Sequence, residues 1–150
     1  HPEGADLRMV GTILKIITDI ERVGDLAVDI ARCTLSIEGE MGTAEGIDIP
    51  RIALLARTVF HLAIEAYVRQ DEALVQQVDA VEQEVDALYK DLMNQIRELM
   101  RAHPEQAVPL GSLLLAINHL ERVADHGHNI SERVAFVITG EMRTHQVKTA

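Results

Sequence analysis

Two short stretches of the chain, 100 residues apart, carry the same pair of carboxylates. The first reads Glu-Arg-Val-Gly-Asp and places Glu21 and Asp25 four residues apart, and the second reads Glu-Arg-Val-Ala-Asp and does the same with Glu121 and Asp125. Both stretches lie in segments with helical periodicity, where residues four apart project from one side of a helix, one turn above the other. The spacing therefore predicts two stacks of acidic side chains that could bind a cation.

A third segment repeats the spacing with Glu82 and Asp86. On a helical wheel of roughly 100° per residue, Glu21 falls inside an apolar stripe, with Asp25 and Asp29 along its edge. Glu82 likewise has apolar residues as its neighbours on the wheel. Three helical segments thus each carry a Glu-x-x-x-Asp pair at the margin of a predicted core.

The second copy of the motif continues in the same way, because Asp125 and Asn129 follow Glu121 along one edge of the stripe. Like charges four residues apart cost a helix roughly 0.2–0.5 kcal/mol, and an unpaired carboxylate facing a core costs several kcal/mol more. A hard cation held by oxygen ligands from adjacent helices would offset that cost. Ligands of this kind favour iron, manganese, magnesium or calcium, with zinc also possible. We therefore interpret the three pairs as metal ligands.

Two other interpretations of these residues stay open. Acidic residues in so acidic a chain can lie on solvated faces without binding anything, although three pairs at the same place relative to the stripe speak against that. The step from Asp125 to His128 resembles the carboxylate-x-x-His step of di-iron helical bundles, but those bundles need it on two helices, and Asp25 is followed by Val28. We interpret His126 and His128 as groups that support ligands or lie at the surface, and Cys33 as a small core residue.

The composition predicts an all-α protein. In 150 residues, 47% are hydrophobic but only 3% aromatic, and aliphatic side chains suit helices that pack side by side. The net charge of −10 argues against a nucleic acid or an anionic lipid surface as a partner. One cysteine excludes an internal disulfide, and no apolar run approaches the roughly 20 residues needed to cross a bilayer. We expect a cytoplasmic protein with no membrane insertion.

The periodicity predicts an antiparallel bundle of four helices. Three cover about 7–39, 50–69 and 110–139, the remaining one follows Asp71 and carries apolar residues from Leu74 to Leu99, and a glycine-rich connector lies at 40–49. Asp6 and Asp71 are expected as N-caps and Gly140 as a terminator. The chain opens with His-Pro rather than Met, which favours a segment of a longer protein. Either residues 1–39 are the last helix of a first repeat and 50–150 a complete three-helix second repeat, or the whole is one four-helix bundle.

Four stretches resemble the PhoU family of phosphate-uptake regulators. They are Asp6-Leu7-Arg8, Asp19 to Asp25, Glu82 to Tyr89, and Leu120 to His126 followed by Asn129-Ile130. The resemblance implies two three-helix bundles in tandem, each binding a metal cluster, of which this chain would carry the last helix of the first and all of the second. By that resemblance the first cluster's ligands are Glu21, Asp25 and Asp29. The second cluster's ligands are Glu82, Asp86, Glu121 and Asp125, with Asn129 adjacent.

The resemblance also implies a function that is regulatory and not enzymatic. A protein of this kind represses phosphate-starvation signalling and modulates phosphate transport by binding a phosphate transporter complex and a membrane sensor kinase, often as a homodimer. Iron, zinc, manganese or magnesium would occupy its clusters. A carboxylate-bridged di-metal enzyme of the ferritin-like oxidase class is the alternative, and a purely structural helical adaptor is the third possibility.

Overall fold

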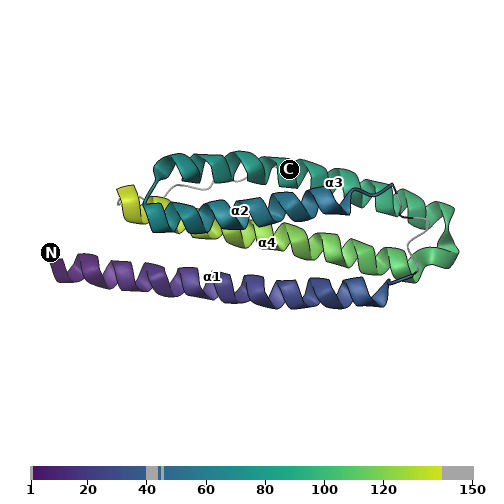
Figure 1. Ribbon diagram of the computed structural model, residues 1–150, viewed down its shortest axis with the longest axis horizontal. Helices are drawn as coiled ribbons and strands as arrows, with labels where there is room; N and C mark the ends of the chain where they lie inside the picture. The colour runs from purple at the N-terminus through teal and green to yellow at the C-terminus, as the bar shows by residue number, and fades with distance from the viewer. Residues whose placement is uncertain (1, 40–43, 45, 140–150) are drawn as a thin grey trace.

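A computed structural model describes residues 2–39, 44 and 46–139, and within these it is built of α-helices, without a strand. The long helices are α1 (Pro2–Ser36), α2 (Ile49–Arg69), α3 (Glu72–Ala102) and α4 (Ala107–Thr139), with a short 3-10 helix η2 (Pro104–Gln106) before the last. The four long helices run side by side along one axis (Figure 1). The prediction of an all-α helical bundle is confirmed.

Local sequence signals set the ends of the middle helices. Asp48 accepts a hydrogen bond from the backbone N–H of Arg51, and Pro50 stands in the first turn of α2, where its missing N–H costs nothing. Asp71 accepts from the N–H of Ala73 and caps α3, as predicted. Between them Gln70 adopts a left-handed conformation at φ 54°, and this tight turn makes α2 and α3 antiparallel neighbours.

Two predicted boundaries were wrong. The first helix begins at Pro2, so Asp6 lies inside it and is not its cap. The last helix begins at Ala107, because Pro109 occupies its first turn, where a proline is tolerated, and does not delay the start. Residues 40–43 and 45 of the expected connector lie outside the described residues, as does Gly140.

The core lies among α2, α3 and α4, and α4 contributes most to it. The large side chains that are fully buried in this core come from all three helices: Ile52, Val59, Val75, Val78, Val85, Leu92, Ile96, Leu110, Ile117, Ile130 and Val134. The two helices α2 and α4 approach each other closely at Gly127, since a Cβ built there would lie 3.0 Å from Val59 Cγ1 and 3.1 Å from backbone atoms of Phe60. α4 is therefore the central helix, with α2 and α3 against it and α1 along its other side (Figure 1).

α1 packs on α4 through a face that the sequence pattern did not single out. The residues it buries are Thr12, Ile16, Asp19, Leu26 and Cys33. The expected apolar stripe is largely exposed instead, with Leu14 at 59% and Ile17 at 52%. The stripe points away from α4, so its predicted burial was wrong for this chain. α1 has two apolar faces, and only one of them is covered by the described residues.

Cys33 of α1 is buried, as expected of a small core residue. Burial raises the pKa of its thiol, and the nearby Asp29 carboxylate raises that pKa further. Both effects keep the thiol protonated and unreactive. Within the described part of the chain, none of the helices combines the length and apolar character required to cross a bilayer.

Candidate metal centre

A line of acidic side chains with one histidine follows the contact between α3 and α4. We call it the carboxylate seam, and its members are Asp79, Glu82 and Asp86 of α3 with Asp125, His128 and Glu132 of α4. The two helices are antiparallel, and in the seam residues from the first half of α3 face residues from the second half of α4. Two of the three carboxylate pairs noticed in the sequence thus contribute to one surface.

Glu82, Asp86 and Asp125 form the first group of the seam. Each offers one carboxylate oxygen, and the three oxygens lie within 4.8 Å of one another. Glu82 and Asp86 are half-buried, whereas Asp125 is exposed. An all-oxygen set open to solvent on one side fits a hard divalent cation that keeps some of its water ligands. The expected pairing of α3 with α4 is therefore present in the structure, while the binding of a metal there stays a prediction.

Glu121 and Asn129 lie half-buried on α4 but outside this group of three. The pKa of Tyr89 reflects the charged side chains near Glu121. Its phenol has a raised pKa, because burial disfavours the phenolate and the Glu121 carboxylate repels it, with Arg97 opposing and Asp125 adding a smaller repulsion. Glu121 thus extends the negative field of the seam by one turn without joining the ligand group.

His128 stands at the centre of a second group, one turn along the seam. Its Nε2 atom lies 3.2 Å from Asp79 Oδ1, 3.3 Å from Glu132 Oε1 and 3.4 Å from Glu82 Oε2. The side chains of His128, Glu82 and Glu132 are between 15% and 18% exposed. Sequence reasoning missed Asp79 and Glu132 and treated His128 as a supporting or surface group. The four-residue step from His128 to Glu132 was a signal that could have revealed the group.

His126 was also expected to support ligands or to lie at the surface, but it is buried between α1 and α4. Its Nδ1 lies 2.9 Å from Asp19 Oδ1, and the Nε of Arg133 donates to the other Asp19 oxygen at 3.4 Å. Asp19 itself is only 4% exposed. This buried polar cluster joins the first helix to the last.

The three acidic residues expected for a first cluster do not come together with other ligands among the described residues. Glu21 and Asp25 are exposed on the side of α1 that points away from α4. Asp29 is half-buried and pairs with Arg32 at 3.7 Å. A metal site on α1 therefore stays a prediction that depends on other helices covering this face.

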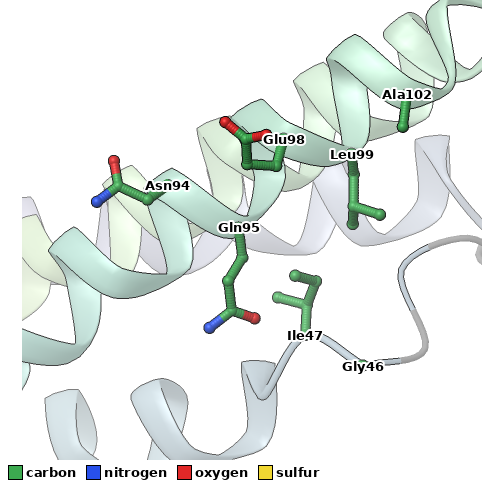
Figure 2. Close-up of a pocket in the computed structure, with 7 residues that line it drawn as sticks. All are labelled: Gly46, Ile47, Asn94, Gln95, Glu98, Leu99 and Ala102. Atoms are coloured by element: carbon green, nitrogen blue, oxygen red, sulfur yellow. The ribbon is translucent and has the colours of Figure 1, made fainter.

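A separate pocket of about 600 Å³ lies beyond the seam, at the carboxyl-terminal end of α3 (Figure 2). Ile47 and Leu99 form its apolar wall, and the side chains of Asn94, Gln95 and Glu98 line its edge. Glu98 pairs with Arg101 at 2.6 Å. The pocket gathers neither several carboxylates nor a histidine, so its donor set does not suit a metal.

The fold and the seam together define a helical-bundle protein with a carboxylate-rich centre between antiparallel helices. A family model described as the PhoU domain matches residues 1–34 and 49–134. The chain belongs to the PhoU family.

Curated relatives and solved structures agree with that assignment. The chain is 31% identical over 141 residues to a phosphate-specific transport system accessory protein PhoU homologue of Pseudomonas putida, covering 93% of the chain and 55% of the relative. It is 31% identical over 136 residues to the Clostridium acetobutylicum homologue, covering 91% of the chain and 62% of that relative. The crystal structure of PhoU from Pseudomonas aeruginosa superposes with a TM-score of 0.85 at 29% identity, over 91% of the chain and 66% of that structure. The chain thus spans less than two thirds of the length of these relatives.

Proposed function

We propose that the chain is a metal-binding regulator of phosphate transport, which represses phosphate-starvation signalling by binding a phosphate transporter and a membrane sensor kinase in the cytoplasm. The binding of a metal is supported by the group of Glu82, Asp86 and Asp125, in which the first two are half-buried and the third is exposed, and whose three oxygens lie within 4.8 Å of one another. The transport role follows from the relatives, which are named accessory proteins of the phosphate-specific transport system.

A mechanism that suits this geometry links charge to helix packing. Three carboxylates close together repel one another, and the repulsion acts between α3 and α4. A bound divalent cation would supply the positive charge that offsets it. Glu82 and Asp86 would then hold α3 in a fixed register against Asp125, and the outer surface of both helices would be presented to a partner in one arrangement.

The competing proposal of a ferritin-like oxidase has less support. Di-iron bundles place a carboxylate-x-x-His step on two helices, and in the seam only α4 supplies a histidine, His128. The relatives carry names of accessory and regulatory proteins. We therefore propose no catalytic role for the seam.

A cellular experiment tests the regulatory function. In a bacterium that lacks its own PhoU protein, the chain is expected to restore repression of a phosphate-starvation reporter, and Asp86→Asn is expected to lose most of that repression. The exposed Asp91, on the same helix, provides the matched control Asp91→Asn, which should repress like the wild type. If both variants repress equally at equal protein levels, the carboxylate seam is not needed for repression, and this part of the proposal is wrong.

We also propose that the chain forms a homodimer through the exposed apolar face of α1. The face carries Leu14 and Ile17, each more than half exposed, and Val10 and Val28 continue it on either side. Exposed apolar stripes of this size on one helix are typical of surfaces that another helix covers. Light scattering of the purified chain should give a dimer mass, and the double change Leu14→Glu with Ile17→Glu should give a monomer. A wild type that stays monomeric at high concentration would contradict the dimer.

A further inference from the structure

The arginine inside the repeated Glu-Arg-Val motif plays no part in the carboxylate seam. It is Arg22 in the first copy and Arg122 in the second, and both side chains are exposed. The ion pairs recorded among the described residues include neither of them. In a chain with 24 acidic residues, the same position of the motif twice presents a guanidinium to solvent. The two arginines are therefore available to a partner.

The packing of α1 on α4 places both arginines on one face of the helix pair. The two helices run in opposite directions (Figure 1), and Asp19 of α1 contacts His126 of α4. At about 100° per residue, Arg22 lies about 60° from Asp19 around α1, and Arg122 lies about 40° from His126 around α4, in the same sense. Since the helices are antiparallel, rotations of the same sense lead to the same face of the pair. Arg22 and Arg122 thus lie on one side of the contact between α1 and α4.

Two more basic residues extend this face along α1. Arg8 and Lys15 precede Arg22 by steps of seven residues, which return to nearly the same side of a helix. Both are exposed, and neither belongs to an ion pair recorded among the described residues. We call Arg8, Lys15, Arg22 and Arg122 the basic strip. From Arg8 to Arg22 the strip is about 21 Å long, at a rise of about 1.5 Å per residue.

A pocket of about 400 Å³ opens at the end of the basic strip, between the first turns of α1 and the last turns of α4. Its lining includes Arg8, Met9 and Thr12 from α1 and Phe136 and Val137 from α4. The Thr12 hydroxyl donates to the backbone oxygen of Arg8 at 2.9 Å, so it is already engaged within α1. The walls therefore offer mainly apolar surface, with one positive charge at Arg8. Such a pocket suits an apolar side chain that has acidic neighbours.

We propose that the basic strip is the docking surface for an acidic segment of a partner protein, with one apolar side chain of that segment in the pocket. Arginine pairs with carboxylates through two parallel hydrogen bonds, and exposed arginines in a row select a partner with acidic residues along its length. A buried apolar anchor beside charged contacts is a common arrangement in protein interfaces. The inference deepens the proposed regulatory function, and it rests on that function only for the identity of the partner.

The charges around the basic strip favour a protein segment over a nucleic acid or an anionic membrane. The seven-residue line of α1 continues to Asp29, and the exposed Asp125 follows Arg122 by three residues on α4. A short acidic segment fits within these bounds, whereas a membrane surface or a duplex would extend over them. The chain as a whole carries a net charge of −10 and repels an extended polyanion.

Fluorescence anisotropy of a labelled oligoglutamate peptide that ends in one phenylalanine tests the proposal on the purified chain. The wild type should bind the peptide, and added NaCl should weaken the binding. Arg22→Glu with Arg122→Glu should bind at least about tenfold more weakly, because like charges then face the peptide. Arg51→Glu with Arg57→Glu, at two exposed arginines of α2, makes the same change of net charge. This matched control should stay within about twofold of the wild type, because salt screens distant charges.

A wild type that does not bind the peptide would overturn the proposal. Equal losses in the two double variants would overturn it too, since net charge alone would then explain the binding. Tighter binding to phosphatidylglycerol vesicles or to single-stranded DNA than to oligoglutamate would reject a protein segment as the partner. If Arg22→Glu with Arg122→Glu fails to fold, Arg22→Gln with Arg122→Gln replaces it and should also bind more weakly than the wild type.

The anisotropy measurement uses neither a metal nor a reporter strain, so it is independent of the test of the proposed function. A chain that represses the reporter but does not bind the peptide would contradict the docking surface alone. A chain that binds the peptide at the basic strip but does not repress the reporter would contradict the regulatory function and support the docking surface.

Discussion

Replacing Gly127 with valine is expected to destabilise the chain by about 2–3 kcal/mol, because α2 and α4 meet at this residue with no room for a side chain. A Cβ there would lie 3.0 Å from Val59 Cγ1 and 3.1 Å from both Cα and N of Phe60. Two of these three atoms belong to the backbone of α2, so the helix itself would have to move. Urea unfolding followed by circular dichroism measures the loss as a lower midpoint.

The matched control is another helical glycine. A Cβ at Gly24 of α1 would meet no atom within 4 Å, so Gly24→Ala should gain up to about 1 kcal/mol from the better helix propensity of alanine. If the stability falls at Gly127 and rises at Gly24, the loss at Gly127 is due to the packing of α2 against α4. Equal, small effects at both would contradict the close approach of α2 to α4.

Replacing Asp19 with alanine is expected to cost about 3 kcal/mol of the free energy of unfolding. Asp19 is 4% exposed. One of its carboxylate oxygens lies 2.9 Å from Nδ1 of His126, and the other accepts a hydrogen bond from Nε of Arg133 at 3.4 Å, both residues being on α4. Its removal would leave two basic groups of α4 facing the contact with α1 without their carboxylate. Because this contact joins α1 to the rest of the bundle, amide hydrogen exchange of α1 should rise more than that of α2.

Asp6 provides the comparison for this prediction, because it is an exposed aspartate on the same helix. Asp6→Ala should change the stability by no more than about 0.5 kcal/mol. If Asp19→Ala proved equally mild, the buried cluster would not be what holds α1 on α4.

The helices were predictable because their signals are local. Asp71 and Pro50 mark helix starts through their own side chains, and the 3.6-residue period of the apolar residues needs no knowledge of partners. The face that α1 buries was not predictable in the same way. Ile16 and Ile17 are both apolar but project about 100° apart on one helix. Which of the two is buried depends on α4, which is far away in the sequence.

The candidate site was predicted in part for the same reason. The four-residue spacing of Glu82 and Asp86 indicated which residues share a side of α3, and the repeat of the motif indicated the partner Asp125. Neither motif predicts the register of α3 against α4. Only that register brings Asp79 to His128, and so only the structure revealed the second group.

The central claim is that the seam between α3 and α4 binds a divalent cation, and calorimetric titration of Mn²⁺ into the metal-free chain tests it most directly. Glu82, which belongs to the all-oxygen group, and the exposed Glu84 lie two residues apart on α3. The account predicts that Glu82→Gln weakens Mn²⁺ binding at least about tenfold while Glu84→Gln binds as the wild type. A wild type that binds no Mn²⁺, or two variants of equal affinity, would contradict it.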